Sequence, residues 1–140
     1  DVLYASARDG MLYSLASVDA PFRAEQPLFF PRFFHQLVMS DARHVVALGG
    51  ISGMHFGSRI RSVETVELGR SEPTVITFTL QNPLRGRNRQ GTFAALGSLY
   101  VFGGNRSLNQ HDFAPEDFVA DAGRLDLSGL AWHPLPDYPK

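Results

Sequence analysis

Arginine is the residue whose number and placement most suggest a binding function. The chain holds twelve arginines but a single lysine, Lys140. Eight of the arginines fall in four polar segments, at 21–34, 51–61, 83–89 and 105–118. A guanidinium group offers a planar fork of donors that pairs with a carboxylate or a phosphate. These segments therefore suggest a surface for an acidic partner, the alternative being a genome whose base composition favours arginine codons.

The candidate binding residues stand in or beside these segments. They are Arg32, His35, Arg59, Arg61, Arg87, Arg89, Gln90 and Arg106. A structural role is the alternative for Arg32 and Arg87, which would bridge neighbouring sheets through backbone carbonyls. His35 would then hold the inner strands by hydrogen bonds, and the other arginines would lie in solvated loops.

Other chemistries find less support in the sequence. The absence of cysteine excludes disulfides, thiolate zinc sites and a cysteine nucleophile from this segment. None of the five histidines pairs with another at metal-ligand spacing, and neither a nucleophile elbow nor a phosphate-binding loop occurs. We therefore predict no metal and no cofactor, and we favour binding over catalysis.

The composition indicates a folded protein without an obvious nucleic-acid or membrane partner. Its hydrophobic fraction is 44% and its formal net charge is −1. No apolar run approaches the ~18–20 residues of a membrane span, so we expect no membrane partner. Although the lack of cysteine does not define a compartment, we lean towards a cytoplasmic location.

The positions of arginine and glycine reveal an internal repeat. Arg32 and Arg87 are 55 residues apart, and the pairs Gly49-Gly50 and Gly103-Gly104 are 54 residues apart. A period near ~50 residues is typical of the blades of a β-propeller. Each glycine pair ends an apolar run, where glycine tolerates a positive φ and close backbone approach.

Each repeat is predicted to hold four strands. The expected strands are 35–39, 45–48, 62–68 and 75–80 in the unit at 32–83, and 90–96, 99–102, 121–127 and 130–135 in the unit at 87–140. Two further strands, 3–6 and 11–15, flank the hairpin signal Asp9-Gly10 and read as the third and fourth strands of a preceding unit at 1–20. Pro21, Pro27 and Pro31 then mark the crossing to the next unit.

These features together resemble the kelch repeat. Its pattern is an arginine near the start, a hydrophobic strand ending in two glycines, and an aromatic pair with six residues between; here Leu125 and Trp132 have that spacing. The resemblance implies an all-β fold of four-stranded antiparallel blades, about two and a half of them in one propeller domain, with Trp132 filling the space between sheets.

The kelch resemblance also implies how such a chain works. The loops before each first strand and after each second strand would lie on one face and bind a protein or another anionic ligand. The remaining blades would come from the same protein or another chain. Kelch-like enzymes are the alternative, among them sialic acid epimerases and copper-radical oxidases, which need Tyr, His and Cys ligands. A further alternative is an accessory domain of a larger RNA-modifying enzyme.

Overall fold

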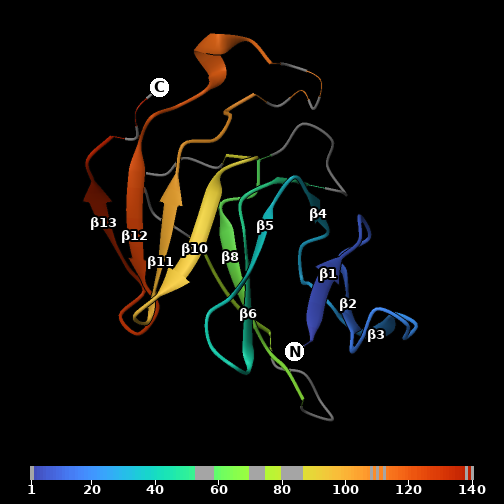
Figure 1. Cartoon of the computed structure of the whole chain (residues 1–140). Coiled ribbons are helices and arrows are strands. Elements are labelled where there is room, and N and C mark those ends of the chain that lie inside the picture. The colour runs from blue at the N-terminus through green and yellow to red at the C-terminus, as the bar shows by residue number, and fades with distance from the viewer. Residues whose placement is uncertain are drawn as a thin grey trace.

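The computed structural model describes residues 2–52, 59–69, 87–107, 109, 111, 113–137 and 139, and the backbone of 75–79. The described residues are almost entirely β-strand and turn, which confirms the all-β class (Figure 1). Their one helical element is a short 3₁₀ turn, η1 (Pro115–Asp117). Within these residues no helix is long and apolar enough to cross a membrane.

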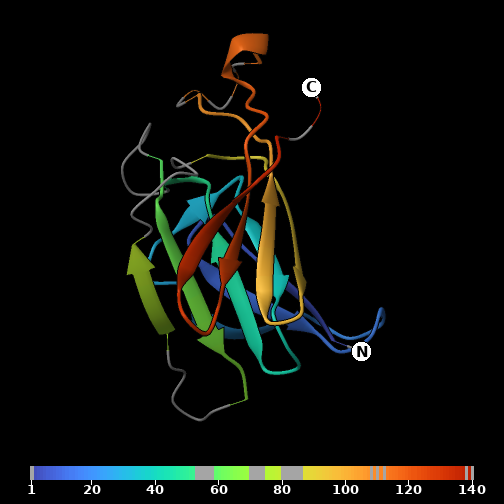
Figure 2. The ribbon, with the colours of Figure 1, turned by 90° about the vertical axis from the view of Figure 1, so that its left-hand side faces the viewer.

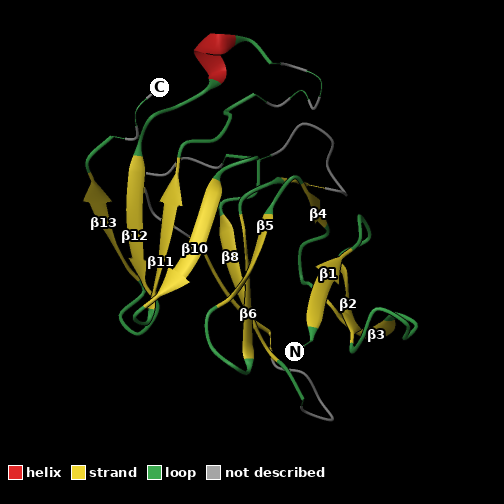
Figure 3. Ribbon diagram, in the orientation of Figure 1, coloured by secondary structure: helices red, strands yellow, loops and turns green. Residues whose placement is uncertain are grey.

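The described strands form three larger antiparallel sheets and one sheet of two short strands (Figure 3). Sheet I holds β1 (Leu3–Ser6), β2 (Met11–Leu15) and β3 (Arg23–Pro27). Sheet II holds β5 (Gln36–Met39), β6 (His44–Leu48), β8 (Ser62–Glu67) and β9 (Val75–Thr79). Sheet III holds β10 (Gly91–Ala95), β11 (Ser98–Phe102), β12 (Ala122–Asp126) and β13 (Ala131–Leu135). The short strands β4 (Arg32–Phe33) and β7 (Ile51–Ser52) pair with each other.

The ends of the sheets differ in the kind of connection they carry. At one end the strands are joined by tight turns. Between β10 and β11, Leu96 and Gly97 both have positive φ, as a short hairpin loop requires. Between β5 and β6, the Asp41 carboxylate accepts the backbone N–H groups of Arg43 and His44 and so stabilises the turn. The opposite end carries the longer connections and η1 (Figure 2). We call this the loop end: residues 31–35, 49–52, 59–61, 87–90, 103–107 and 113–121.

The core lies between the sheets, which pack face to face. Val46, Leu48 and Val63 of sheet II form one buried cluster with Leu99, Val101 and Leu125 of sheet III. Trp132 packs against the same cluster. A second cluster lies on the other face of sheet II, where Val45, Ala47 and Val66 meet Leu12 of sheet I, with Leu28 and Leu68. Sheet II is therefore covered on both faces, which explains the continuous apolar run of β6.

Sheet I differs from the sequence prediction. Residues 21–31 are not only a crossing, because β3 (Arg23–Pro27) pairs with β2 across a shift in register. Proline is tolerated at the end of such an edge strand, where its missing N–H costs no ladder bond. Because β3 pairs with β2, sheet I extends past residue 20.

Candidate functional site

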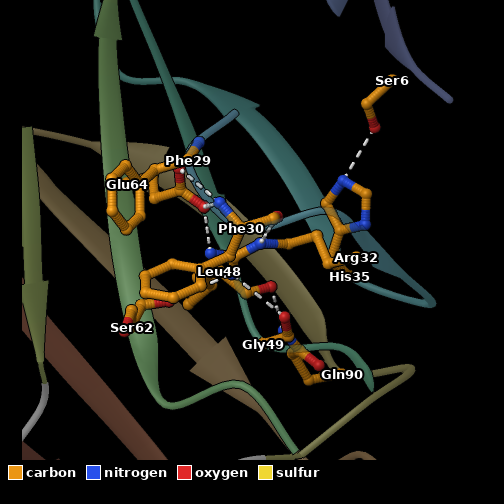
Figure 4. A network of polar contacts seen from close by, with 10 residues as sticks. All are labelled: Ser6, Phe29, Phe30, Arg32, His35, Leu48, Gly49, Ser62, Glu64 and Gln90. Carbon is orange, nitrogen blue, oxygen red and sulfur yellow. Dashed lines mark hydrogen bonds and ion pairs between the residues drawn. The ribbon is translucent and has the colours of Figure 1, made fainter. Parts of the chain in front are cut away.

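Arg32 is the centre of a buried polar network at the loop end (Figure 4). Its side chain is 0% exposed and forms an ion pair with Glu64, whose side chain is also 0% exposed. Arg32 Nη1 donates to the carbonyl oxygens of Gly49 (3.1 Å) and Ser62 (3.0 Å). Glu64 also accepts the backbone N–H groups of Phe29 and Phe30. The pair thus fastens the connection from sheet I onto the second and third strands of sheet II.

Burial and ion pairing have opposite effects on the pKa of Arg32. Desolvation lowers the pKa of Arg32, whereas the charge of Glu64 and the hydrogen bond to it raise that pKa. A buried charge is tolerated when its donors are satisfied in this way.

Arg87 repeats the arrangement one unit later. Its Nη1 donates to the carbonyl oxygens of Gly103 (2.8 Å) and Asp121 (3.1 Å), and its Nη2 lies 3.0 Å from the Asp121 carboxylate. Arg87 is 2% exposed, whereas the Asp121 side chain is 53% exposed. Both guanidinium groups are buried against backbone carbonyls, which is the arrangement that the structural alternative for Arg32 and Arg87 predicts.

His35 and Gln90 occupy equivalent positions and join neighbouring sheets. Gln90 Nε2 donates to the carbonyl oxygen of Leu48 (3.0 Å), and His35 Nε2 lies 2.7 Å from Ser6 Oγ. Gln90 is 2% exposed. Burial, and secondly the positive charge of Arg32, lower the pKa of His35 to about 4, which keeps its imidazole neutral near neutral pH.

The second glycine of each pair lies close to the backbone at the start of its own unit. A Cβ on Gly50 would lie 2.7 Å from the carbonyl oxygen of Phe33, and one on Gly104 would lie 2.9 Å from that of Asn88. Both glycines have positive φ, 89° and 101°. Glycine is therefore required here by both backbone conformation and space.

Arg89 is the candidate residue whose surroundings most favour binding. Its guanidinium carbon lies 4.1 Å from the ring centroid of Phe34 and 5.1 Å from that of Phe113. Phe34 is 39% exposed and Phe113 is 62% exposed. Arg89 Nη1 also donates to Asn88 Oδ1 (2.6 Å), and Asn88 is held in turn by the carbonyl oxygen of Ser107. The loop end thus carries a fixed guanidinium between two accessible aromatic rings.

The other predicted arginines are also at the loop end. Arg61 is exposed, Arg59 is half-buried and forms a backbone bridge to Ile51, and Arg106 is half-buried and donates its N–H to Asp117. Burial lowers the pKa of Arg87, the charge of Asp121 and the hydrogen bond to it raise that pKa, and the positive charge of Arg106 lowers it. Residues 53–58 and 83–86, which belong to the predicted binding segments, lie outside the described residues.

The aromatic part of this site was not predicted from the sequence. Phe34 and Phe113 did not enter the prediction, and neither did Glu64, the buried partner of Arg32. The pair Phe33-Phe34 next to Arg32 could have indicated it. Successive side chains of a strand point to opposite faces, so two adjacent phenylalanines in a polar connection cannot both be buried on one face.

A 370 Å³ pocket lies beside these residues, between sheets I and II. It is lined by residues 4–8 on one side and by residues 32–35 and Leu37 on the other. In the described part of the chain, no three His, Cys, Asp or Glu side chains gather where they could hold a metal ion.

The comparisons with known proteins give a fold relationship. No family model and no curated protein matches the chain. A solved structure described as a novel fungal alcohol oxidase with catalytic diversity among the AA5 family, in complex with copper, is similar over 99% of the chain, with a TM-score of 0.72 and 15% sequence identity. The chain spans 30% of the length of that structure. At this identity the likeness concerns the fold alone: the chain shares its arrangement of antiparallel sheets with part of a larger protein.

Proposed function

We propose that this chain is a run of consecutive blades from a kelch-type β-propeller, and that its loop end binds a protein partner through Arg89 and the phenylalanines around it. The repeat supports the first part. Equivalent residues of successive units make equivalent contacts: Arg32 and Arg87 bind backbone carbonyls, and His35 and Gln90 each reach back to the preceding sheet. Sheets that pack face to face in chain order are the unit from which a propeller is built.

The observation that carries the binding role is the position of Arg89 between Phe34 and Phe113. Arginine and aromatic residues are enriched at the energetic centres of protein interfaces. A guanidinium that is already held over a ring loses little rotamer freedom when it binds a carboxylate. We expect the partner to place an acidic side chain at Arg89 and apolar side chains on the exposed rings.

A selection from a displayed peptide library against the chain tests this proposal. We expect enriched peptides that combine Asp or Glu with apolar residues, and a loss of affinity of about tenfold or more in the Arg89→Ala variant, as for a central interface arginine. The control is Arg43→Ala, because Arg43 is exposed in the tight turn at the opposite end of sheet II. Peptides that bind equally to the Arg89→Ala variant would contradict the proposal.

A catalytic role in a larger kelch-type protein is the second candidate, and the likeness to the copper-containing alcohol oxidase favours it. This segment contains no cysteine, so any thiolate ligand would come from elsewhere. Titration of the chain with Cu²⁺ separates the candidates. Stoichiometric, tight copper binding would support the oxidase reading over a binding module.

The salt dependence of binding distinguishes an accessory role in an RNA-modifying enzyme from the binding of a protein partner. An anionic polymer held by the arginines would be released steeply as salt is raised. A protein contact centred on Arg89 and its aromatic neighbours would respond much less, because apolar burial is not screened.

A further inference from the structure

Arg8 is a second arginine that lies over an aromatic ring, beside the loop end. It is exposed in the turn that joins β1 to β2, next to β4 (Figure 1). Its guanidinium carbon lies 5.7 Å from the ring centroid of Phe33. Among the described residues no carboxylate forms an ion pair with Arg8. Its charge is therefore available to a partner.

The turn that carries Arg8 is packed against the connection that leads to Phe33. The carbonyl oxygen of Gly10 accepts the N–H of Leu28 (2.7 Å), and a Cβ on Gly10 would lie 3.0 Å from the Cα of Pro31. The backbone positions of Arg8 and Phe33 are thus fixed relative to each other. A surface that is arranged before binding loses less conformational freedom when a partner binds.

A row of contacts links Arg8 to Arg89. The rings of Phe33 and Phe34 meet edge to face, with centroids 5.2 Å apart and an interplanar angle of 69°. Arg8 lies over the first ring, and Arg89 lies over the second at 4.1 Å. Each of two adjacent rings therefore carries its own guanidinium group. We call these four residues the arginine–phenylalanine row.

The dimensions of the row suit an extended acidic segment. The contacts of 5.7, 5.2 and 4.1 Å, laid end to end, are the most that can separate the two guanidinium carbons. An extended chain advances ~3.3 Å per residue, so acidic side chains about two to four residues apart can reach both groups. Alternate side chains share a face, so with a separation of four the residue midway also faces the rings.

The charge of the whole chain favours a peptide over a nucleic acid. The formal net charge is −1, which gives no general attraction to a polyanion. Single-stranded RNA is held by a continuous positive groove, with bases stacked on aromatic rings. Two separate cations with rings between them match a segment that has two acidic side chains and an apolar one.

We infer that Arg8 is a second anchor for the proposed partner, which binds as an extended segment with one acidic side chain at Arg8, another at Arg89 and an apolar side chain over Phe34. This inference rests on the proposed binding role of Arg89 and adds the class of segment that the surface selects. A single exposed ion pair contributes little, so the preference for two acidic residues comes from using both cations at once.

The blocked peptide Glu-Ala-Leu-Ala-Glu is the probe, and Gln-Ala-Leu-Ala-Glu and Glu-Ala-Leu-Ala-Gln are its matched peptides with one acid. In chemical-shift titrations we expect the two-acid peptide to bind about three- to fivefold more tightly than either one-acid peptide. Arg8→Gln should remove this preference without loss of fold, because Arg8 is exposed. The control Arg43→Gln, in the tight turn at the opposite end of sheet II, should bind all three peptides as the parent chain does.

The variants separate this inference from the proposed function. Equal binding of the two-acid peptide to the parent chain and to Arg8→Gln would overturn the inference, and the proposed function would still stand if Arg89→Gln weakens binding. Unchanged binding in both variants would overturn both. A short uridine oligonucleotide that binds more tightly than the two-acid peptide, and loses affinity in Arg8→Gln, would also overturn the inference, since the row would then hold phosphates.

Discussion

Phe34 and Arg89, 55 residues apart, hold the same position in successive repeats and touch each other across the junction between sheets II and III. Both have left-handed backbone, with φ of 57° and 55°. The N–H of Arg89 donates to the carbonyl oxygen of Phe34 (3.0 Å), and its guanidinium carbon lies 4.1 Å from the Phe34 ring centroid. Two strained positions of the repeat are thus brought together at the proposed binding site, where such strain tends to collect.

The strain at Arg89 can be separated from its ring contacts by two substitutions. Arg89→Ala removes the contacts with the two rings but retains the conformational free-energy cost of a non-glycine residue with positive φ. Arg89→Gly loses the contacts and relieves about 1 kcal/mol of that cost. Urea denaturation should therefore show the glycine variant to be more stable than the alanine variant. The reverse order would mean that residue 89 is not left-handed.

Replacing Arg32 should destabilise the chain more than replacing Arg87. Arg32→Ala leaves Glu64 buried without its cation, which costs about 3–5 kcal/mol. Arg87→Ala leaves Asp121, whose side chain is 53% exposed and can be hydrated, so we expect a loss nearer 1–3 kcal/mol for the broken hydrogen bonds. Denaturant titration of both variants measures the difference. Equal losses would contradict the buried pair.

Stability should fall in mild acid because of His35. Its pKa is about 4 in the folded chain against 6.5 when unperturbed, so the unfolded chain binds the proton more readily. The contribution is complete above pH 6.5 and is lost as pH falls towards 4, by up to about 3 kcal/mol. His35→Gln, which places the residue of the equivalent position 90 there, should remove this part of the pH dependence. An unchanged slope in that variant would rule out His35 as its source.

Alanine substitutions at Gly50 and Gly97 distinguish the effect of steric crowding on stability from the effect of backbone conformation. Both have positive φ, but a Cβ on Gly50 would meet Phe33 O at 2.7 Å, while one on Gly97 meets nothing within 4 Å. Gly97→Ala should cost about 1–2 kcal/mol for the conformation alone. Gly50→Ala should cost about 1–3 kcal/mol more, because the backbone at Phe33 and His35, in the same unit, must move away. Thermal unfolding of the two variants gives the comparison, and similar melting temperatures would contradict the close approach.

The sequence predicts the strands well because their signals are local. The glycine pairs and the alternating patterns define β6, β8, β11 and β12 to within one or two residues. The strand β3 (Arg23–Pro27) was missed because its polar residues and terminal proline read as a connection. Among the described strands it pairs with β2 alone and lies at a sheet edge, where a strand needs little apolar character.

The site was only partly predictable because burial in this fold depends on distant segments. Glu64 lies in the strand Ser62–Glu67, and its carboxylate is buried by partners from the preceding connection, the N–H groups of Phe29 and Phe30 and the guanidinium of Arg32. Arginine count alone therefore could not separate the structural Arg32 and Arg87 from Arg89. That distinction depends on which carbonyl groups and rings surround each guanidinium.

The stacking of consecutive sheets is the claim on which the rest depends, and a double-mutant cycle tests it. Val46 and Val101 share the cluster between sheets II and III, whereas Val45, the neighbour of Val46, packs on the opposite face of sheet II. Val46→Ala and Val101→Ala should couple by about 0.5–1 kcal/mol in the free energy of unfolding, and Val45→Ala with Val101→Ala should be additive. Additivity in both cycles, or coupling through Val45 instead, would contradict the face-to-face arrangement of the repeats.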